Sequence, residues 1–155
     1  MANTTVQLEV EVFIRETWMP ERFLQKFTKD KVRLISGGLF EFDAVSPDAL
    51  IGASISTSGA KTKSGKKGAG KIFKLRSDML YLLQADFARR FIVLTEKDMS
   101  DECVKEKYLG RHPIEIEFFL AELPQELRQR LESARVSASD EVSPVLGYSA
   151  NLKEP

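Results

Sequence analysis

Hydrophobic and polar residues alternate with two different periods along this chain, and the changes of period mark its expected helices and strands. In residues 31–37, 38–46 and 50–58, apolar and polar positions follow the two-residue period that is typical of strands. Gly37-Gly38 and Ser46-Pro47-Asp48 separate these segments and suit hairpin turns. The pattern therefore predicts a meander of three strands.

Outside this meander, helical and extended patterns follow one another. Helical spacing of apolar residues, or a helix start and stop signal, marks the segments 5–17, 20–27, 71–90, 100–110 and 124–136. Two further strands are expected, a continuously apolar one at 91–96 and an alternating one at 113–123. The first helical segment also alternates like a strand in "VQLEVEVFI", so both interpretations stay open there. This order predicts an α/β fold with a mixed central sheet flanked by helices.

Composition adds limits to this picture. The 155 residues are enough for one domain, expected over 1–136, followed by a polar and loosely ordered tail over 137–155. Cys103 is the only cysteine, which favours a reduced, cytoplasmic setting. No apolar run approaches membrane-spanning length, so no membrane partner is expected. The single histidine, His112, precedes a proline and is expected to be a surface turn residue rather than a metal ligand.

Charge is unevenly distributed, although the formal net charge is zero. Residues 58–77 contain no acidic residue but one arginine and six lysines: Lys61, Lys63, Lys66, Lys67, Lys71 and Lys74. Such a run repels itself unless a polyanion relieves it, and a glycine-rich basic loop that opens a helix can lie along phosphates. The six lysines therefore predict nucleic-acid binding. A solvated loop that only keeps the protein soluble is the alternative.

The same segment also fits G-x-x-x-x-G-K, from Gly65 to Lys71. A nucleotide-binding loop needs Ser or Thr after its lysine, because that hydroxyl holds magnesium, and it should follow a strand directly. Here Ile72 follows the lysine, and residues 57–64 separate the pattern from the preceding strand. Nucleotide binding is therefore the least favoured interpretation.

Strand alternation predicts a polar surface on the meander. In "LFEFDAVS", Glu41 and Asp43 share one face with Val45, while the phenylalanines line the other face. In the next strand, Ser54 and Ser56 share one face. If the apolar faces of both strands meet the same core, the two acids and the two serines come together beside the lysine-rich loop.

This layout resembles the PD-(D/E)XK nuclease superfamily, which has the restriction-endonuclease-like fold, over residues 20–120. In "GGLFEFDAVSPDALIGASISTS", Asp43 matches the metal-binding Asp of the family, and Ser54 and Ser56 stand at the positions of the acid and the lysine of its E-x-K motif. The resemblance implies a deoxyribonuclease that uses Mg²⁺ or Mn²⁺ to polarise the scissile phosphate. Because restriction-like enzymes often work as dimers, it also implies a homodimer.

The two serines depart from the family, since serine is a weak ligand for a hard cation and cannot replace the lysine. If the protein is active, the missing groups must come from elsewhere. Candidates for the acid are Glu41, Glu11 and Glu16, and candidates for the lysine are Lys61, Lys63, Lys71 and Lys74. The sequence thus predicts Asp43 and Glu16 as metal ligands, and Asp43, Glu41, Lys61 and Lys63 as catalytic residues. The alternative is an inactive nuclease-fold module that binds DNA or a protein partner.

Overall fold

The computed structural model describes residues 2–61 and 68–136, with side chains described from residue 5 onward. Residues 11–122 form one compact unit, and residues 2–10 and 123–136 belong to a second. The single domain over 1–136 stays a prediction, and the expected tail over 137–155 lies outside the described residues. None of the helices in the described part combines the length and the apolar composition that crossing a bilayer requires.

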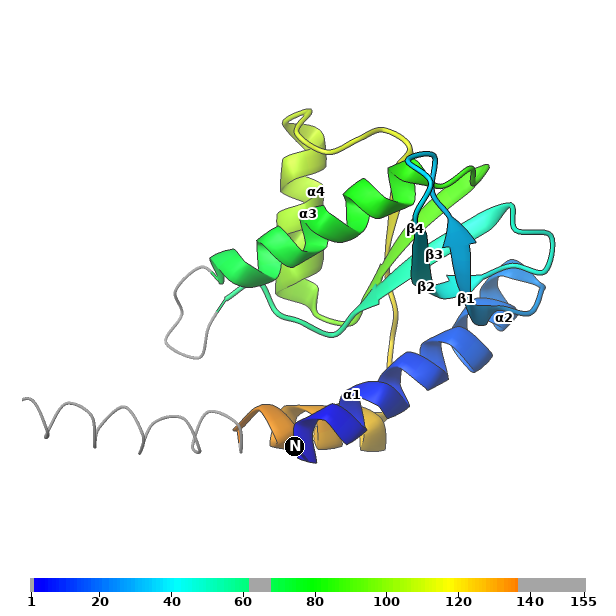
Figure 1. Cartoon of the computed structure of the whole chain (residues 1–155). Coiled ribbons are helices and arrows are strands. Elements are labelled where there is room, and N and C mark those ends of the chain that lie inside the picture. Colours follow the sequence, from blue (N-terminus) through cyan, green and yellow to red (C-terminus); the bar gives the residue numbers. More distant parts are fainter. Residues whose placement is uncertain (1, 62–67, 137–155) are drawn as a thin grey trace, which may run out of the picture. The chain divides into compact units, whose positions relative to one another are not determined.

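The larger unit is built on a five-stranded mixed sheet (Figure 1). Its strands lie side by side in chain order: β1 (Thr28–Arg33), β2 (Leu39–Val45), β3 (Ile51–Ser56), β4 (Arg89–Leu94) and β5 (Ile116–Leu120). β1, β2 and β3 pair antiparallel, whereas β3–β4 and β4–β5 are parallel. The prediction of an α/β protein with a meander inside a mixed sheet is confirmed.

Helices α3 (Ala69–Gln84) and α4 (Lys97–Tyr108) lie on the same side of the sheet (Figure 1). They bury the stripe that the helical spacing predicted, together with alternate residues of β4. The members of this core include Ile72, Leu75, Met79, Leu82, Met99, Cys103, Ile92 and Leu94. The helix expected over 71–90 ends at Gln84, because the chain must turn before it enters β4.

The N-terminal segment is helical, which settles the ambiguity of "VQLEVEVFI" against a strand. It runs through α1 (Ala2–Phe13), the π-helical turn η1 (Ile14–Trp18) and α2 (Met19–Phe23). Within the larger unit, the Phe23 ring stacks on Phe91 with centroids 4.6 Å apart and meets Phe119 edge-on at 5.3 Å. Phe91 alternates with the α3-facing Ile92, so η1 and α2 cover the opposite face of the sheet.

The smaller unit contains a helix over 125–136, which agrees with the segment expected to begin at Pro124. Within this unit, Arg130 Nη1 lies 2.6 Å from Glu9 Oε2, and Arg130 Nη2 donates to Glu9 Oε1 at 2.8 Å. This two-pronged contact joins the helix to α1.

The start of β3 is packed closely against the core. A Cβ atom at Gly52 would lie 2.1 Å from Cε2 of Phe87, so only glycine fits at this position. The Phe87 ring in turn meets Phe42 edge-on, with centroids 5.1 Å apart. Phe87, in the loop before β4, thus packs the start of β3 against β2.

Candidate phosphate-binding site at the end of strand β3

Strand β2 carries a β-bulge at the position of Asp43. In the β1–β2 ladder, Asp30 is opposite Phe42 but Thr28 is opposite Val45, so β2 contains one more residue than β1 in this interval. Because of this extra residue, Phe42 and Val45 both belong to the core beneath α3. The expectation that Val45 lies on the face opposite the phenylalanines is therefore wrong.

The bulge directs the Asp43 side chain toward β3. The two strands pair at Ala44–Ala53 and Val45–Gly52. Beyond these pairs, the Asp43 side chain links the strands: its Oδ2 accepts a hydrogen bond from the Ile55 N–H at 2.8 Å. Burial raises the pKa of Asp43 to about 6, although the bond from Ile55 opposes this change. Asp43 is thus a half-buried carboxyl group that titrates near neutral pH.

Four charged side chains from α1, η1, β1 and β2 form ion pairs near Asp43. Arg15, in η1, donates to Glu11 Oε1 at 3.0 Å and to the Asp43 carbonyl oxygen at 3.1 Å. Lys29 Nζ lies 3.4 Å from Glu11 Oε1 and 3.7 Å from Glu41 Oε1. The negative charge of Glu11 raises the pKa of Asp43 further, while the positive charge of Lys29 lowers it. The acids on this side are therefore already paired with basic residues.

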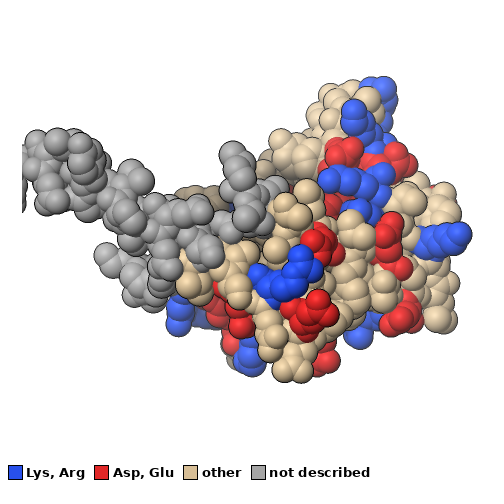
Figure 2. Space-filling view, turned by 90° about the horizontal axis from the view of Figure 1, so that it is seen from below, with Lys and Arg blue, Asp and Glu red and all other residues tan. Residues whose placement is uncertain are grey.

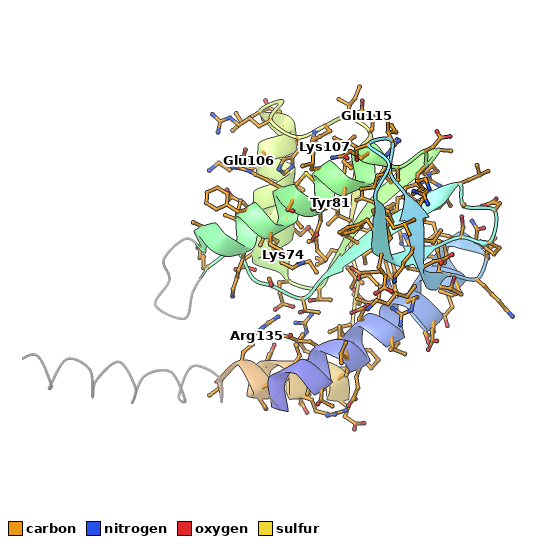
Figure 3. All side chains as sticks on the ribbon, viewed as in Figure 1. Lys74, Tyr81, Glu106, Lys107, Glu115 and Arg135 are labelled. Carbon is orange, nitrogen blue, oxygen red and sulfur yellow. The ribbon has the colours of Figure 1, made fainter. Side chains whose placement is uncertain are left out.

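On the other side of Asp43, helix α3 contributes an acid that the sequence analysis missed. The charge of Asp78 also raises the pKa of Asp43, and burial raises the pKa of Asp78 itself. Lys74 Nζ lies 3.4 Å from Asp78 Oδ2. Lys71, Lys74, Asp78 and Tyr81 follow one another at three- and four-residue spacing, so they share one flank of α3; Figure 3 labels Lys74 and Tyr81 along this helix.

Ser54 and Glu41 do not join Asp43 on one polar surface. Ser54 is buried, and its neighbour across the parallel ladder is Ile92, which belongs to the core beneath α3. Glu41 is exposed and pairs instead with Lys29. The bulge is the physical reason, because it breaks the alternation from which a common face was inferred. The predicted convergence of all four residues on one polar surface is therefore wrong for Ser54 and Glu41. For Asp43 and Ser56 it stays a prediction.

The base of the lysine-rich segment is held at the end of β3. Asp98, in the first turn of α4, accepts hydrogen bonds at Oδ2 from the backbone N–H groups of Ala60 at 3.0 Å and Lys61 at 3.3 Å. The Gly68 N–H donates to the Ala60 carbonyl at 2.8 Å. The two ends of the segment are thus held together immediately before α3 begins.

The described lysines of this segment all face solvent. Lys61 stands at its base, and Lys71 and Lys74 lie on the first turns of α3. The predicted residues Lys63, Lys66 and Lys67 lie outside the described residues. On the face of the molecule shown in Figure 2, basic and acidic side chains alternate instead. A run of cations without acids is therefore a local property of residues 58–77.

The donor atoms near Asp43 do not match the metal centre that the resemblance implies. Within residues 2–61 and 68–136, no group of three or more His, Cys, Asp or Glu side chains could hold a metal ion. Glu16, the predicted second ligand, is exposed. The E-x-K positions hold the buried Ser54 and the half-buried Ser56. These residues do not fit a nuclease centre of the Asp plus E-x-K type.

A second polar cluster lies at the end of α4, where Glu106 Oε2 and His112 Nδ1 are buried without a hydrogen-bond partner among the described residues. Glu106 is buried and its Oε1 lies 3.5 Å from Arg111 Nη1. The His112 ring stacks on Phe118 with centroids 5.2 Å apart, and burial lowers the pKa of His112. Figure 3 shows Glu106 on α4, away from the labelled Lys74 of α3. His112 is therefore a half-buried turn residue, and the expectation that it lies on the surface is wrong because its ring packs on Phe118.

Comparison of the chain with protein-family models, with curated proteins and with solved structures gave no significant match. The geometry described above is therefore the basis for a functional assignment.

Proposed function

We propose that this protein binds nucleic acid through its phosphate backbone, at the end of β3 and the first turns of α3. The observation that carries the proposal is the acid-free run of seven basic side chains over residues 58–77. The bond from the Gly68 N–H to the Ala60 carbonyl places Lys61 close to the start of α3, which carries Lys71 and Lys74, so this run concentrates positive charge at the end of β3. A polyanion relieves the repulsion that this concentration causes.

The same region favours an external anion over an internal partner. Lys61 and Lys71 face solvent, and Lys74 keeps 73% of its side chain exposed although it approaches Asp78. Because most of the Lys74 side chain is in solvent, its ammonium group can contact a phosphate while it stays near the half-buried Asp78. By contrast, the cations near Asp43 are held by Glu11 and Glu41.

The fold proposed for this function is restriction-endonuclease-like, and two features support it. The meander β1–β2–β3 is followed by a helix and a strand parallel to β3, which is the order that the resemblance implies. Asp43 lies where β2 and β3 stop pairing, beside the chain segment that carries the lysines. Because the donor set around it does not fit a metal-dependent nuclease, we propose binding without hydrolysis.

Binding is tested by titrating a fluorescent oligonucleotide with the wild-type protein and two double variants at several salt concentrations. Lys71→Ala with Lys74→Ala should weaken binding about tenfold and reduce the slope of log K against log salt by about 2, since each lost phosphate contact removes close to one unit. The matched control, Lys26→Ala with Lys105→Ala, removes the same charge from exposed lysines elsewhere and should change neither quantity. Equal losses in the two double variants would refute a local site.

Lys63 and Lys66, which the sequence predicts as contacts but which lie outside the described residues, can be tested in the same titration. Lys63→Ala with Lys66→Ala should weaken binding and flatten its salt dependence as the α3 variant does. If this pair changes nothing while the α3 pair does, the contact is limited to the helix.

Hydrolysis with Mg²⁺ or Mn²⁺ is the second candidate, and one observation favours it. Asp43 and Asp78 are two carboxyl groups whose pKa values are both raised by burial, and the charge of Asp78 acts on Asp43. Mg²⁺ often uses one or two carboxylates together with substrate phosphates. Nicking of a supercoiled plasmid that requires Mn²⁺ and disappears in Asp43→Ala would establish this candidate. Tight binding without nicking under either ion would exclude it.

A further inference from the structure

Phe73, in the second turn of α3, is a large aromatic side chain that remains 61% exposed. It stands between Lys71 and Lys74 in the sequence, within the acid-free segment. A single exposed apolar residue is common on protein surfaces. An exposed aromatic ring among basic residues is different, because this pair of features is what proteins use to hold unpaired bases.

The direction of the Phe73 side chain places its ring near the proposed phosphate contacts. Side chains on a helix slant toward its N-terminus, so the Phe73 side chain is directed toward the first turn of α3. Space is open there: a Cβ atom at Gly70 would meet no described atom within 4 Å. The guanidinium carbon of Arg76 lies 5.9 Å from the centroid of the Phe73 ring. The ring thus has a cation beside it and solvent in front of it.

We propose that Phe73 is a stacking platform for an unpaired base, so that the preferred ligand is a single-stranded nucleic acid. This inference rests on the proposed function and specifies its substrate class. Lysine–phosphate contacts do not distinguish single strands from duplexes by base, because every backbone carries the same charge. Stacking does distinguish them, since the bases of a duplex already stack on one another and only an unpaired base offers a free face.

The experiment compares three fluorescent probes at one salt concentration: a thymidine oligomer of about 16 nucleotides, an abasic strand of the same length, and a duplex of the same length. Wild-type protein should bind the thymidine strand about tenfold more tightly than the abasic strand, because both carry the same phosphates but only one carries bases. Phe73→Ala should remove this preference and change binding of the abasic strand and the duplex less than about twofold.

Three further variants separate stacking from apolar bulk. Phe73→Trp keeps an aromatic face and should retain the preference, whereas Phe73→Leu keeps an apolar side chain without that face and should lose it. Leu80→Ala, an exposed apolar residue on the same helix, should leave all three affinities unchanged. Thermal unfolding of each variant should match wild type, since Phe73 and Leu80 are both largely exposed.

The outcomes distinguish this inference from the function on which it rests. If the wild type binds all three probes equally, and the Lys71 and Lys74 substitutions reduce the salt dependence, the phosphate site stands and the stacking proposal is wrong. If Phe73→Ala weakens the duplex as much as the thymidine strand, Phe73 supports the fold of the site rather than a base. If no probe binds, both proposals are wrong.

Discussion

The two ends of strand β3 differ in what holds them. At its start, Gly52 and Ala53 pair with β2, and Gly52 is pressed against the Phe87 ring. Toward its end, the Asp43 carboxylate binds the Ile55 N–H, and Asp98 binds the backbone just beyond the strand. On its β2 side, the start of the strand is thus held by ladder pairing and close packing, whereas two carboxylates bind the backbone at and beyond its last residues. These two regions are called the packed end and the polar end below.

The largest effect is expected at the packed end. Gly52→Ala would place a methyl group 2.1 Å from Phe87 Cε2, so the ring or the strand must move, at a cost of about 3 kcal/mol in the free energy of unfolding. Urea denaturation of the variant measures this loss. Phe87→Leu should restore part of it in the double variant, because the smaller side chain removes the clash.

Gly70→Ala is the matched control for this substitution. The added Cβ atom would meet no described atom within 4 Å, and alanine is favoured over glycine in a helix. Its stability should equal or exceed that of the wild type. A similar loss in both variants would show that the close packing at Gly52 is not what the glycine is needed for.

The next effect concerns Asp43 at the polar end. Its pKa is raised from 3.8 to about 6 in the folded protein, so between these pH values the folded state binds more protons than the unfolded state. Stability from this group therefore rises as the pH falls from neutral toward 4, by about 2 kcal/mol. Asp43→Asn keeps an acceptor for the Ile55 N–H but cannot titrate, so its stability should change less over this range.

The measurement is urea denaturation of both proteins at several pH values. The difference between them isolates Asp43, although burial also raises the pKa of Asp78 and both curves therefore retain a rise toward low pH. If stability changed with pH in the same way in both proteins, the pKa of Asp43 would not be raised by folding. The polar end would then not contain a carboxyl group perturbed by burial.

A smaller effect is expected at Asp98, which closes the base of the lysine-rich segment. Asp98→Ala leaves the Ala60 and Lys61 N–H groups without this acceptor and also removes the bond from the Met99 N–H, so the protein should lose about 1 kcal/mol of stability. Asp101→Ala, on the same helix, removes only an exposed pair with Lys97 and should cost less than half as much. Equal losses would show that the segment does not depend on Asp98.

The core beneath α3 could be predicted from the sequence better than the polar end of β3. Residues such as Ile72, Leu75 and Met79 recur with the period of their helix because one face of it is buried, so their pattern carries the fold. The bulge has no such signature: residues 40–44 alternate between apolar and acidic, yet Val45 lies on the same side as Phe42. A bulge is a mismatch in residue number between two paired strands, so the sequence of one strand alone does not reveal it.

The candidate site was predictable only where its features are local in the sequence. The clustering of lysines is local in sequence, so it could be read directly. The charge of Asp78 acts on Asp43 from a different element, through a contact that only the packing of α3 on the sheet creates. Its spacing of four residues from Lys74 was the available signal, but the same spacing is typical of solvated helix faces. Long-range partners of this kind need coordinates.

The smallest effect is expected at Glu41, which the sequence placed beside Asp43 in a catalytic role. Its carboxylate is 48% exposed and lies 3.7 Å from Lys29, which also contacts Glu11 at 3.4 Å. An exposed pair that shares its lysine contributes little, so Glu41→Gln should change the free energy of unfolding by less than about 0.5 kcal/mol. It should also leave the pH dependence of stability intact, because Glu11 still holds Lys29 beside Asp43. If Glu41→Gln instead reproduced the flattened pH profile of Asp43→Asn, the two acids would act together and Glu41 would belong to the site.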